Sequence, residues 1–158
     1  MSDTIHVRRA TTADAREIAR LMLEVQAVHV EGRPEIFKPG GGERGPEIAA
    51  RIANADHFYW VAACDGAIVG YAFARRIDEV ENQWKYGART LILDQMGVTR
   101  EHQRSGVGER LWHAVRELAI SERVDRIILN VWAFNTSARD FYVKMGFAPF
   151  HERMSVEL

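Results

Sequence analysis

Two glycines separated by one residue open an amphipathic segment, in the sequence QRSGVG at residues 103–108. The segment that follows, ERLWHAVRELAI, has the apolar periodicity of a helix. A glycine inside a helix costs about 1 kcal/mol relative to alanine, so the pair needs a reason. A glycine-rich turn exposes backbone amides at the positive end of the helix dipole and lets an anion approach closely. The pattern therefore indicates a site for a phosphate-bearing ligand.

Two other phosphate loops are excluded by the spacing. Gly106 and Gly108 are followed by Leu111 where a dinucleotide-binding fingerprint requires a third glycine. A P-loop is excluded because the chain has no Gly-Lys-Ser or Gly-Lys-Thr. Taken alone, the motif is equally compatible with a turn before a packed helix.

The first half of the chain carries local signals for a strand, two helices and a hairpin. Thr11 and Asp14 have the spacing of a capping box, and Pro46 suits the first turn of a short helix. Asp65-Gly66 is a strong hairpin signal between two β-rich runs. These signals predict a strand at 5–9, a helix from about 12 to 29, a second helix beginning near Pro46, and strands at 57–63 and 67–75.

The second half predicts a strand on each side of the glycine loop and its helix. The run TLILDQMGV at 90–98 precedes the loop, and residues 126–132 follow the helix. The second run is almost continuously apolar, which is typical of a strand in the centre of a sheet. Asn135 is placed to cap a last helix and Gly146 to end it, after which residues 147–157 supply one or two closing strands.

Composition favours one soluble globular domain spanning residues 1–158. The chain is 47% hydrophobic and 27% charged, with a formal net charge of -1. The near-neutral charge argues against a general nucleic-acid binder. We expect no membrane association and a cytoplasmic location, because no long apolar run and no secretory signal is present. The single cysteine, Cys64, is interpreted as a buried structural thiol, and the histidines lack metal-ligand spacing.

Two stretches in the second half resemble the motifs of one enzyme superfamily. DQMGVTREHQRSGVGERL is similar to the acyl-CoA-binding core of the GNAT (general N-acetyltransferase) superfamily, and ILNVWAFNTSARDFYVKMGF resembles its companion motif. The resemblance is to a small bacterial-type single-domain member. It implies an α/β fold with a mixed sheet of six to seven strands, a splayed central strand pair and about four flanking helices.

The resemblance also implies acetyl-CoA as cosubstrate and assigns the residues that bind it. The CoA pyrophosphate should be wrapped, mainly by backbone amides, by Gln103, Arg104, Ser105, Gly106, Val107 and Gly108. Met96, Gly97 and Val98 end the strand that carries a β-bulge in this family, with Gly97 suited to the distortion. Backbone amides freed by the bulge can bind the thioester carbonyl and the pantetheine arm. Asn135 has two compatible roles, as the helix cap and as a polar contact to the cofactor.

Two side chains acquire catalytic roles through the resemblance. Aromatic residues at helical spacing usually belong to a core, but the motif places the phenol of Tyr142 where it can protonate the leaving CoA sulfur. A primary ammonium has a pKa near 10.4, so a base must remove its proton before attack. Asp94 is the candidate, acting through water. The alternative for Asp94, a solvated charge at a strand end or a structural hydrogen-bond acceptor, stays open.

The predicted reaction is direct transfer of acetyl from acetyl-CoA to a primary amine in a ternary complex. The acceptor is a small molecule or a peptide, and it should enter between the connections at 29–45 and 78–87, where Trp84 and Tyr86 either line the pocket or cover the sheet. A homodimer is possible because dimers are common in the family. A non-catalytic module that binds or senses acyl-CoA is the alternative function. A small nucleotide-binding domain is disfavoured by the failed fingerprints.

Overall fold

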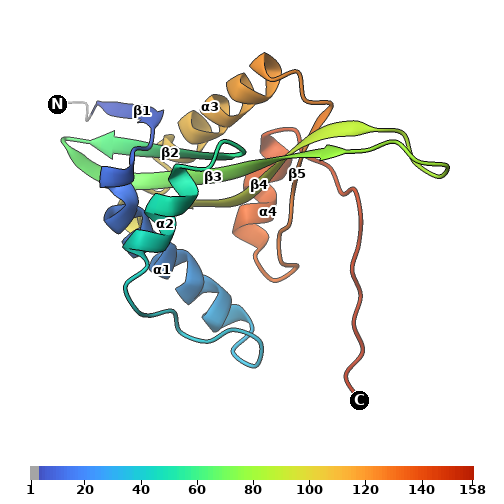
Figure 1. Ribbon diagram of the computed structural model, residues 1–158. Helices are drawn as coiled ribbons and strands as arrows, with labels where there is room; N and C mark the ends of the chain where they lie inside the picture. Colours follow the sequence, from blue (N-terminus) through green and yellow to red (C-terminus); the bar gives the residue numbers. More distant parts are fainter. Residues whose placement is uncertain (1–3) are drawn as a thin grey trace.

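The computed structural model describes residues 4–158, which form one five-stranded sheet with helices on both faces (Figure 1). The strands lie in the order in which they occur along the chain. Neighbours are antiparallel except for the last pair, which is parallel. The strands are β1 (Ile5–Arg9), β2 (His57–Cys64), β3 (Ala67–Glu79), β4 (Ala88–Val98) and β5 (Arg126–Leu129).

Four α-helices cover the sheet, two on each face, as the resemblance implied. They are α1 (Ala15–Gly32), α2 (Gly45–Ile52), α3 (Val107–Ser121) and α4 (Thr136–Lys144). The apolar stripe of α1 and α2 packs on Tyr59, Val61 and Tyr71 on one face, while α3 and α4 pack on the opposite face. Within the described part of the chain, no helix is long and apolar enough to cross a membrane.

The predicted caps and turns of the first half are confirmed. The backbone N–H of Thr11 donates to a carboxylate oxygen of Asp14 at 2.8 Å, completing a capping box at a short 3-10 helix (Thr12–Asp14) that leads into α1. Arg8 binds the same carboxylate at 2.8 Å, and this bond holds the pKa of Asp14 at about 2. Pro46 lies in the first turn of α2, and Asp65-Gly66 forms the β2–β3 turn with both residues at positive φ.

The parallel pair β4–β5 is short, and the two strands part beyond it. Pairing covers residues 90–93 of β4 and 126–129 of β5, whereas β4 continues to Val98. On its other side β4 stays paired with β3, with one irregularity at Asp94. Phe73 faces Gln95 and Ala74 faces Leu93, so Asp94 is the extra residue of a β-bulge. The edge of β4 from residue 94 to 98 is therefore open toward β5.

Two predictions about the sheet are wrong. The described residues form five strands rather than six or seven, because residues 147–157 are extended but pair with no strand of their own chain. The apolar strand at 126–132 ends at Leu129 and lies at the edge of the sheet, not in its centre. Helix packing explains why this edge strand is apolar, because Ile127 and Leu129 pack against the core on the α3 face.

Candidate functional site

Two side chains of the loop between β4 and α3 donate hydrogen bonds to carbonyl groups of the loop and of the end of β4. A 3-10 helix (Arg100–His102) opens the loop after Thr99. The hydroxyl of Ser105 donates to the carbonyl of His102 at 2.5 Å, and the side-chain amide of Gln103 donates to the carbonyl of Val98 at 3.2 Å. These bonds fix the loop and use the side chains of Gln103 and Ser105, which leaves the main chain to face any ligand.

The backbone of this loop presents a run of amide groups at the start of α3. The amide of Gln103 donates to Arg100 at 3.4 Å, and the next backbone hydrogen bond along the described chain runs from Arg110 to Gly106 at 3.1 Å. Between them lie the N–H groups of residues 104–109, of which the last three belong to the first turn of the helix. Arg104 and Gly106 have φ values of 64° and 87°. Left-handed residues in a turn can direct successive N–H groups toward one side, the arrangement found in anion-binding loops.

The three glycines of the stretch at residues 94–111 are each required for a different structural reason. Gly106 needs its left-handed backbone, and a Cβ there would point into open space. A Cβ on Gly108 would lie 3.3 Å from the ring of Phe141, so this glycine allows α3 and α4 to pack closely. A Cβ on Gly97 would lie 2.6 Å from Val25 of α1. Gly97 pairs regularly with Tyr71, so the prediction that it marks the bulge is wrong.

Tyr142 lies on α4 on the face of the sheet that α3 covers. Its ring packs edge-on against Phe141 and Phe147, with ring centroids 5.4 and 5.6 Å apart. Burial raises the pKa of Tyr142 to about 12. Burial also raises the pKa of Tyr71, with smaller contributions from the phenols of Tyr59 and Tyr142. The two phenols lie on opposite faces of the sheet, Tyr142 in the core under α3 and Tyr71 in the core under α1 and α2.

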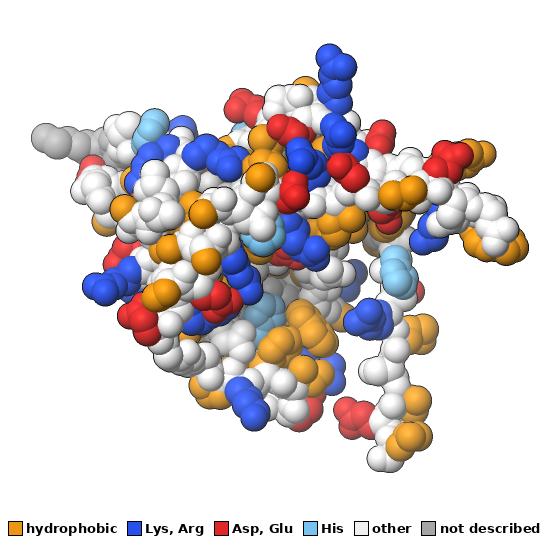
Figure 2. Space-filling model, in the orientation of Figure 1, with side chains coloured by type: hydrophobic (Ala, Val, Ile, Leu, Met, Phe, Trp, Pro, Cys, Tyr) orange, Lys and Arg blue, Asp and Glu red, His pale blue; other side chains and the backbone are white. Residues whose placement is uncertain are grey.

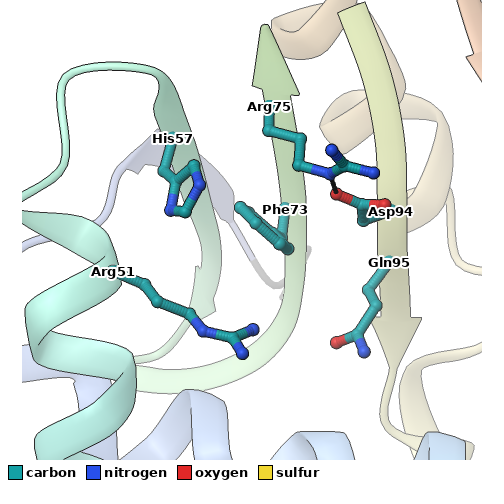
Figure 3. A pocket seen from close by; sticks show the side chains of 6 residues that line it. All are labelled: Arg51, His57, Phe73, Arg75, Asp94 and Gln95. Carbon is teal, nitrogen blue, oxygen red and sulfur yellow. Dashed lines mark hydrogen bonds and ion pairs between the residues drawn. The ribbon is translucent and has the colours of Figure 1, made fainter. Parts of the chain in front are cut away.

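Asp94 lies on the other face of the sheet, in a cavity of about 430 Å³. Its carboxylate accepts a hydrogen bond from the Nε of Arg75 at 2.5 Å (Figure 3). Gln95 accepts from the buried hydroxyl of Tyr71 at 3.1 Å. The bulge turns Asp94 toward the same cavity as its neighbour. The cavity is lined by Arg51, His57, Phe73, Arg75, Asp94 and Gln95.

The remaining site residues lie around the open edge of β4. Asn135 caps α4, its side-chain oxygen accepting from the amide of Ala138 at 3.2 Å, and this uses only one of its polar atoms. Met96 and Val98 are half-buried and contact the core on the α3 face. Val107 of the glycine loop and Tyr142 thus lie on the α3 face of the sheet, and Asp94 lies on the opposite face.

Several residues of the site were missed by sequence reasoning. Arg51, His57, Arg75 and Gln95 come from three strands and a helix, and only the strand register brings them to one cavity. The alternation of side chains between the two faces of a strand, together with the pairing of His57 with Arg75, would have placed both residues on the cavity face. Trp84 and Tyr86, expected to line the pocket or cover the sheet, do neither. They are 84% and 90% exposed on the projecting β3–β4 hairpin (Figure 1).

An aromatic cluster joins the α1–α2 connection to the loop after β5. Phe37 lies 5.1 Å from Trp132 and 5.0 Å from His29, between ring centroids. A Cβ on Gly32 would lie 2.1 Å from the ring of Phe134, so this part of the connection fits tightly. The start of the α1–α2 connection is therefore anchored at residues 29–37.

Comparisons with known proteins show the family and the fold of this chain. Residues 15–147 match the model of the acetyltransferase (GNAT) family. An uncharacterised N-acetyltransferase from the pepI 3' region of Lactobacillus delbrueckii subsp. lactis is 24% identical over 110 residues, or 70% of this chain and 62% of that protein. Human N-acetylaspartate synthetase is 28% identical over 89 residues, or 56% of this chain. The chain spans less than two thirds of these relatives, 27% in the human case.

Solved structures show the same fold over almost the whole chain. The tetramutant of the BH1408 protein of Bacillus halodurans superimposes with a TM-score of 0.91 at 24% identity, covering 97% of this chain and 99% of the other. Aminoglycoside N-acetyltransferase AAC(6')-Iy in complex with CoA has a TM-score of 0.73 at 13% identity, covering 100% and 97%. From the family match over residues 15–147, the chain belongs to the acetyltransferase (GNAT) family.

Proposed function

We propose that the chain is a single N-acetyltransferase domain that transfers acetyl from acetyl-CoA to a primary amine by direct attack in a ternary complex. The observation that carries this proposal is the open edge of β4, which runs from residue 94 to 98 and leads into the amides of residues 104–109, which donate to no backbone carbonyl of residues 4–158. A strand edge without a partner can pair with an extended polar chain such as a pantetheine arm. A helix start with exposed amides suits a diphosphate.

The cofactor residues divide into those that act through the main chain and one that acts through its side chain. Backbone amides in the loop hold the diphosphate, and the N–H and C=O groups of Met96, Gly97 and Val98 hold the pantetheine arm and the thioester carbonyl. Asn135 contributes the polar atoms not used in its cap. The loop segment comprises Gln103, Arg104, Ser105, Gly106, Val107 and Gly108.

The catalytic roles follow from which face of β4 each group occupies. The bound cosubstrate supplies an acetyl group already activated as a thioester. Tyr142 is a phenol that stays protonated at neutral pH, since its pKa is about 12, and it donates its proton to the departing sulfur. Asp94 lies on the opposite face, where it accepts the proton of the attacking amine through water. Its ion pair with Arg75 holds the carboxylate in place.

The test of this function is release of free thiol from acetyl-CoA in the presence of a panel of amines, amino acids and peptides. We expect thiol release that depends on both the protein and one class of acceptor. Tight CoA binding without acetylation across the panel would instead support the alternative, a non-catalytic acyl-CoA-binding module. Binding of ATP but not of CoA would support a nucleotide-binding domain and contradict both.

We also propose that the protein acts as a homodimer in which the C-terminal segment of one copy pairs with the sheet of the other. The C-terminal end of the chain runs away from the body of the molecule (Figure 1) and carries hydrophobic side chains along its length (Figure 2). Met154 and Val156 of this end are 90% and 83% exposed. Met154, Val156 and Leu158 share one side of an extended chain. The outer edge of β5 lacks a partner within residues 4–158, and Arg126 of this strand lies over Phe150 at 5.9 Å. If each copy pairs its C-terminal segment with the β5 edge of the other copy, the apolar side chains become buried and the strand edge gains a partner.

Solution mass measurements test the dimer. We expect the full chain to have the mass of two copies, and the double variant Met154→Asp with Val156→Asp to have the mass of one, because charge on the apolar side opposes burial. Ser155→Asp adds a charge to the opposite side of the same segment and serves as the matched control. A monomeric full chain, or a dimer unaffected by the double variant, would contradict the exchange.

A further inference from the structure

We infer that the acceptor carries a carboxylate near its reacting amine, and that Arg51 binds this carboxylate in the cavity that holds Asp94. The inference rests on the proposed N-acetyltransferase function and narrows its substrate class to small zwitterions, such as amino acids or short peptides with a free carboxyl terminus. It is carried by the charges, the hydrogen-bond donors and the arrangement of the cavity walls.

The cavity lining is not that of a site for polycations. It contains two guanidinium groups, Arg51 and Arg75, against a single carboxylate, Asp94. Arg75 is paired with that carboxylate at 2.5 Å, so the pair is close to neutral. Arg51 therefore decides the sign of the remaining charge. An acceptor that is only cationic would be repelled from this wall, while a carboxylate would be attracted.

The charge of Arg51 is not cancelled by its own neighbour. One of its terminal nitrogens lies 2.7 Å from a carboxylate oxygen of Glu47, one turn earlier on α2. The same carboxylate also binds Arg44, with both contacts at 3.2 Å. Two guanidinium groups thus share one carboxylate, and the three side chains together keep one positive charge. A guanidinium has five N–H donors in a planar fork, so Arg51 has donors left for a ligand.

His57 provides a second donor or acceptor that has no partner. Its Nδ1 is buried and, in the part of the chain that the structure describes, makes no hydrogen bond. The imidazole is held edge-on against Phe73, with ring centroids 5.3 Å apart. Figure 3 shows His57 and Arg51 on the same side of the cavity, across from Asp94. The buried Nδ1 of His57 leaves a polar atom unsatisfied on this wall. The free donors of the Arg51 guanidinium on the same wall favour a ligand that accepts hydrogen bonds.

The two sides of the cavity set the orientation of the acceptor. Arg51 and His57 come from α2 and β2, whereas Asp94 and Gln95 come from β4, whose open edge adjoins the proposed thioester site. A carboxylate bound at Arg51 leaves the amine of the same molecule directed toward Asp94. A zwitterion therefore fits both ends of the cavity at once. Aminoglycosides, with several ammonium groups and no carboxylate, should be poor acceptors.

Matched pairs of acceptors test the inference directly. Each pair consists of an amino acid or dipeptide and the same molecule with its carboxylate replaced by a carboxamide. We expect the wild type to acetylate the carboxylate member with a KM lower by about 10- to 100-fold, the range of a hydrogen-bonded charge pair. In Arg51→Gln that preference should fall to near unity. Arg20→Gln, which removes a guanidinium on α1 that neither lines the cavity nor touches Glu47, is the control and should keep the preference.

Each outcome separates this inference from the function on which it rests. An equal KM for the carboxamide and the carboxylate members in the wild type, or a preference that survives in Arg51→Gln, overturns the carboxylate site and leaves N-acetyltransferase activity standing. If no member of any pair is acetylated, while CoA still binds, the proposed function fails and the inference fails with it.

Discussion

Replacing Gly106 by aspartate should weaken acetyl-CoA binding about 10- to 100-fold relative to Gly106→Asn. The backbone of Gly106 is left-handed at a φ of 87°, a conformation that both aspartate and asparagine tolerate. A side chain there points into open space at the start of α3. The two variants share size and backbone strain, so their difference isolates the effect of a negative charge beside the proposed diphosphate site.

Titration calorimetry of both variants with CoA measures that difference. It should shrink at high salt, because solvent-exposed charges are screened. Thermal unfolding of the two variants is the control and should be nearly the same. Equal CoA affinity for Gly106→Asp and Gly106→Asn at low salt would show that the diphosphate binds elsewhere.

Removing the hydroxyl of Tyr142 should lower turnover by about 100-fold or more, the usual contribution of a positioned general acid. Tyr142→Phe keeps the ring that packs against Phe141 and Phe147, so CoA affinity should hardly change. The phenol is protonated below its pKa of about 12, and this acid is therefore available throughout the neutral range. Loss of wild-type turnover between about pH 8 and 10 would have to come from a different group.

Steady-state kinetics with thiol detection measure this effect, with a matched control on the same chain. Tyr86→Phe removes the same hydroxyl from a tyrosine that is 90% exposed on the β3–β4 hairpin, and it should leave turnover unchanged. If Tyr142→Phe turns over as fast as the wild type, Tyr142 is a packing residue and the sulfur takes its proton from elsewhere.

Local signals in the sequence predicted most of the fold. The capping box at Thr11 and Asp14, the turn at Asp65-Gly66 and the cap at Asn135 act within a few residues, and the structure forms all three. The glycine loop belongs to the same class. Its conformation depends on Gly106 and on hydrogen bonds that span at most five residues.

Features that depend on contacts between distant segments could not be predicted from local sequence signals. An apolar strand reads as central whether a strand or a helix covers it, so β5 was misplaced. Residues 147–157 have a strand-like pattern, but whether they pair with an edge such as that of β5 depends on contacts between distant segments, which the local pattern does not contain. The tight contact of Gly97 with Val25 is also non-local, and without it this glycine is indistinguishable from a bulge residue.

The acceptor cavity shows the same limit within the site. Asp94 was identified from its place beside the motif, but its ion pair joins it to Arg75, nineteen residues earlier on β3. Arg51 and His57 precede and begin β2, with no motif to mark them. The bulge at Asp94, which brings these groups together, is visible only in the register of β3 and β4.

The central claim is that main-chain groups between residues 96 and 108 bind the thioester arm and diphosphate of CoA. An NMR titration of isotope-labelled protein with CoA tests it most directly, because each backbone amide reports separately. The largest changes in amide shift should fall on residues 96–98 and 104–108. Saturating CoA that leaves these amides unchanged, while others shift, would contradict the account.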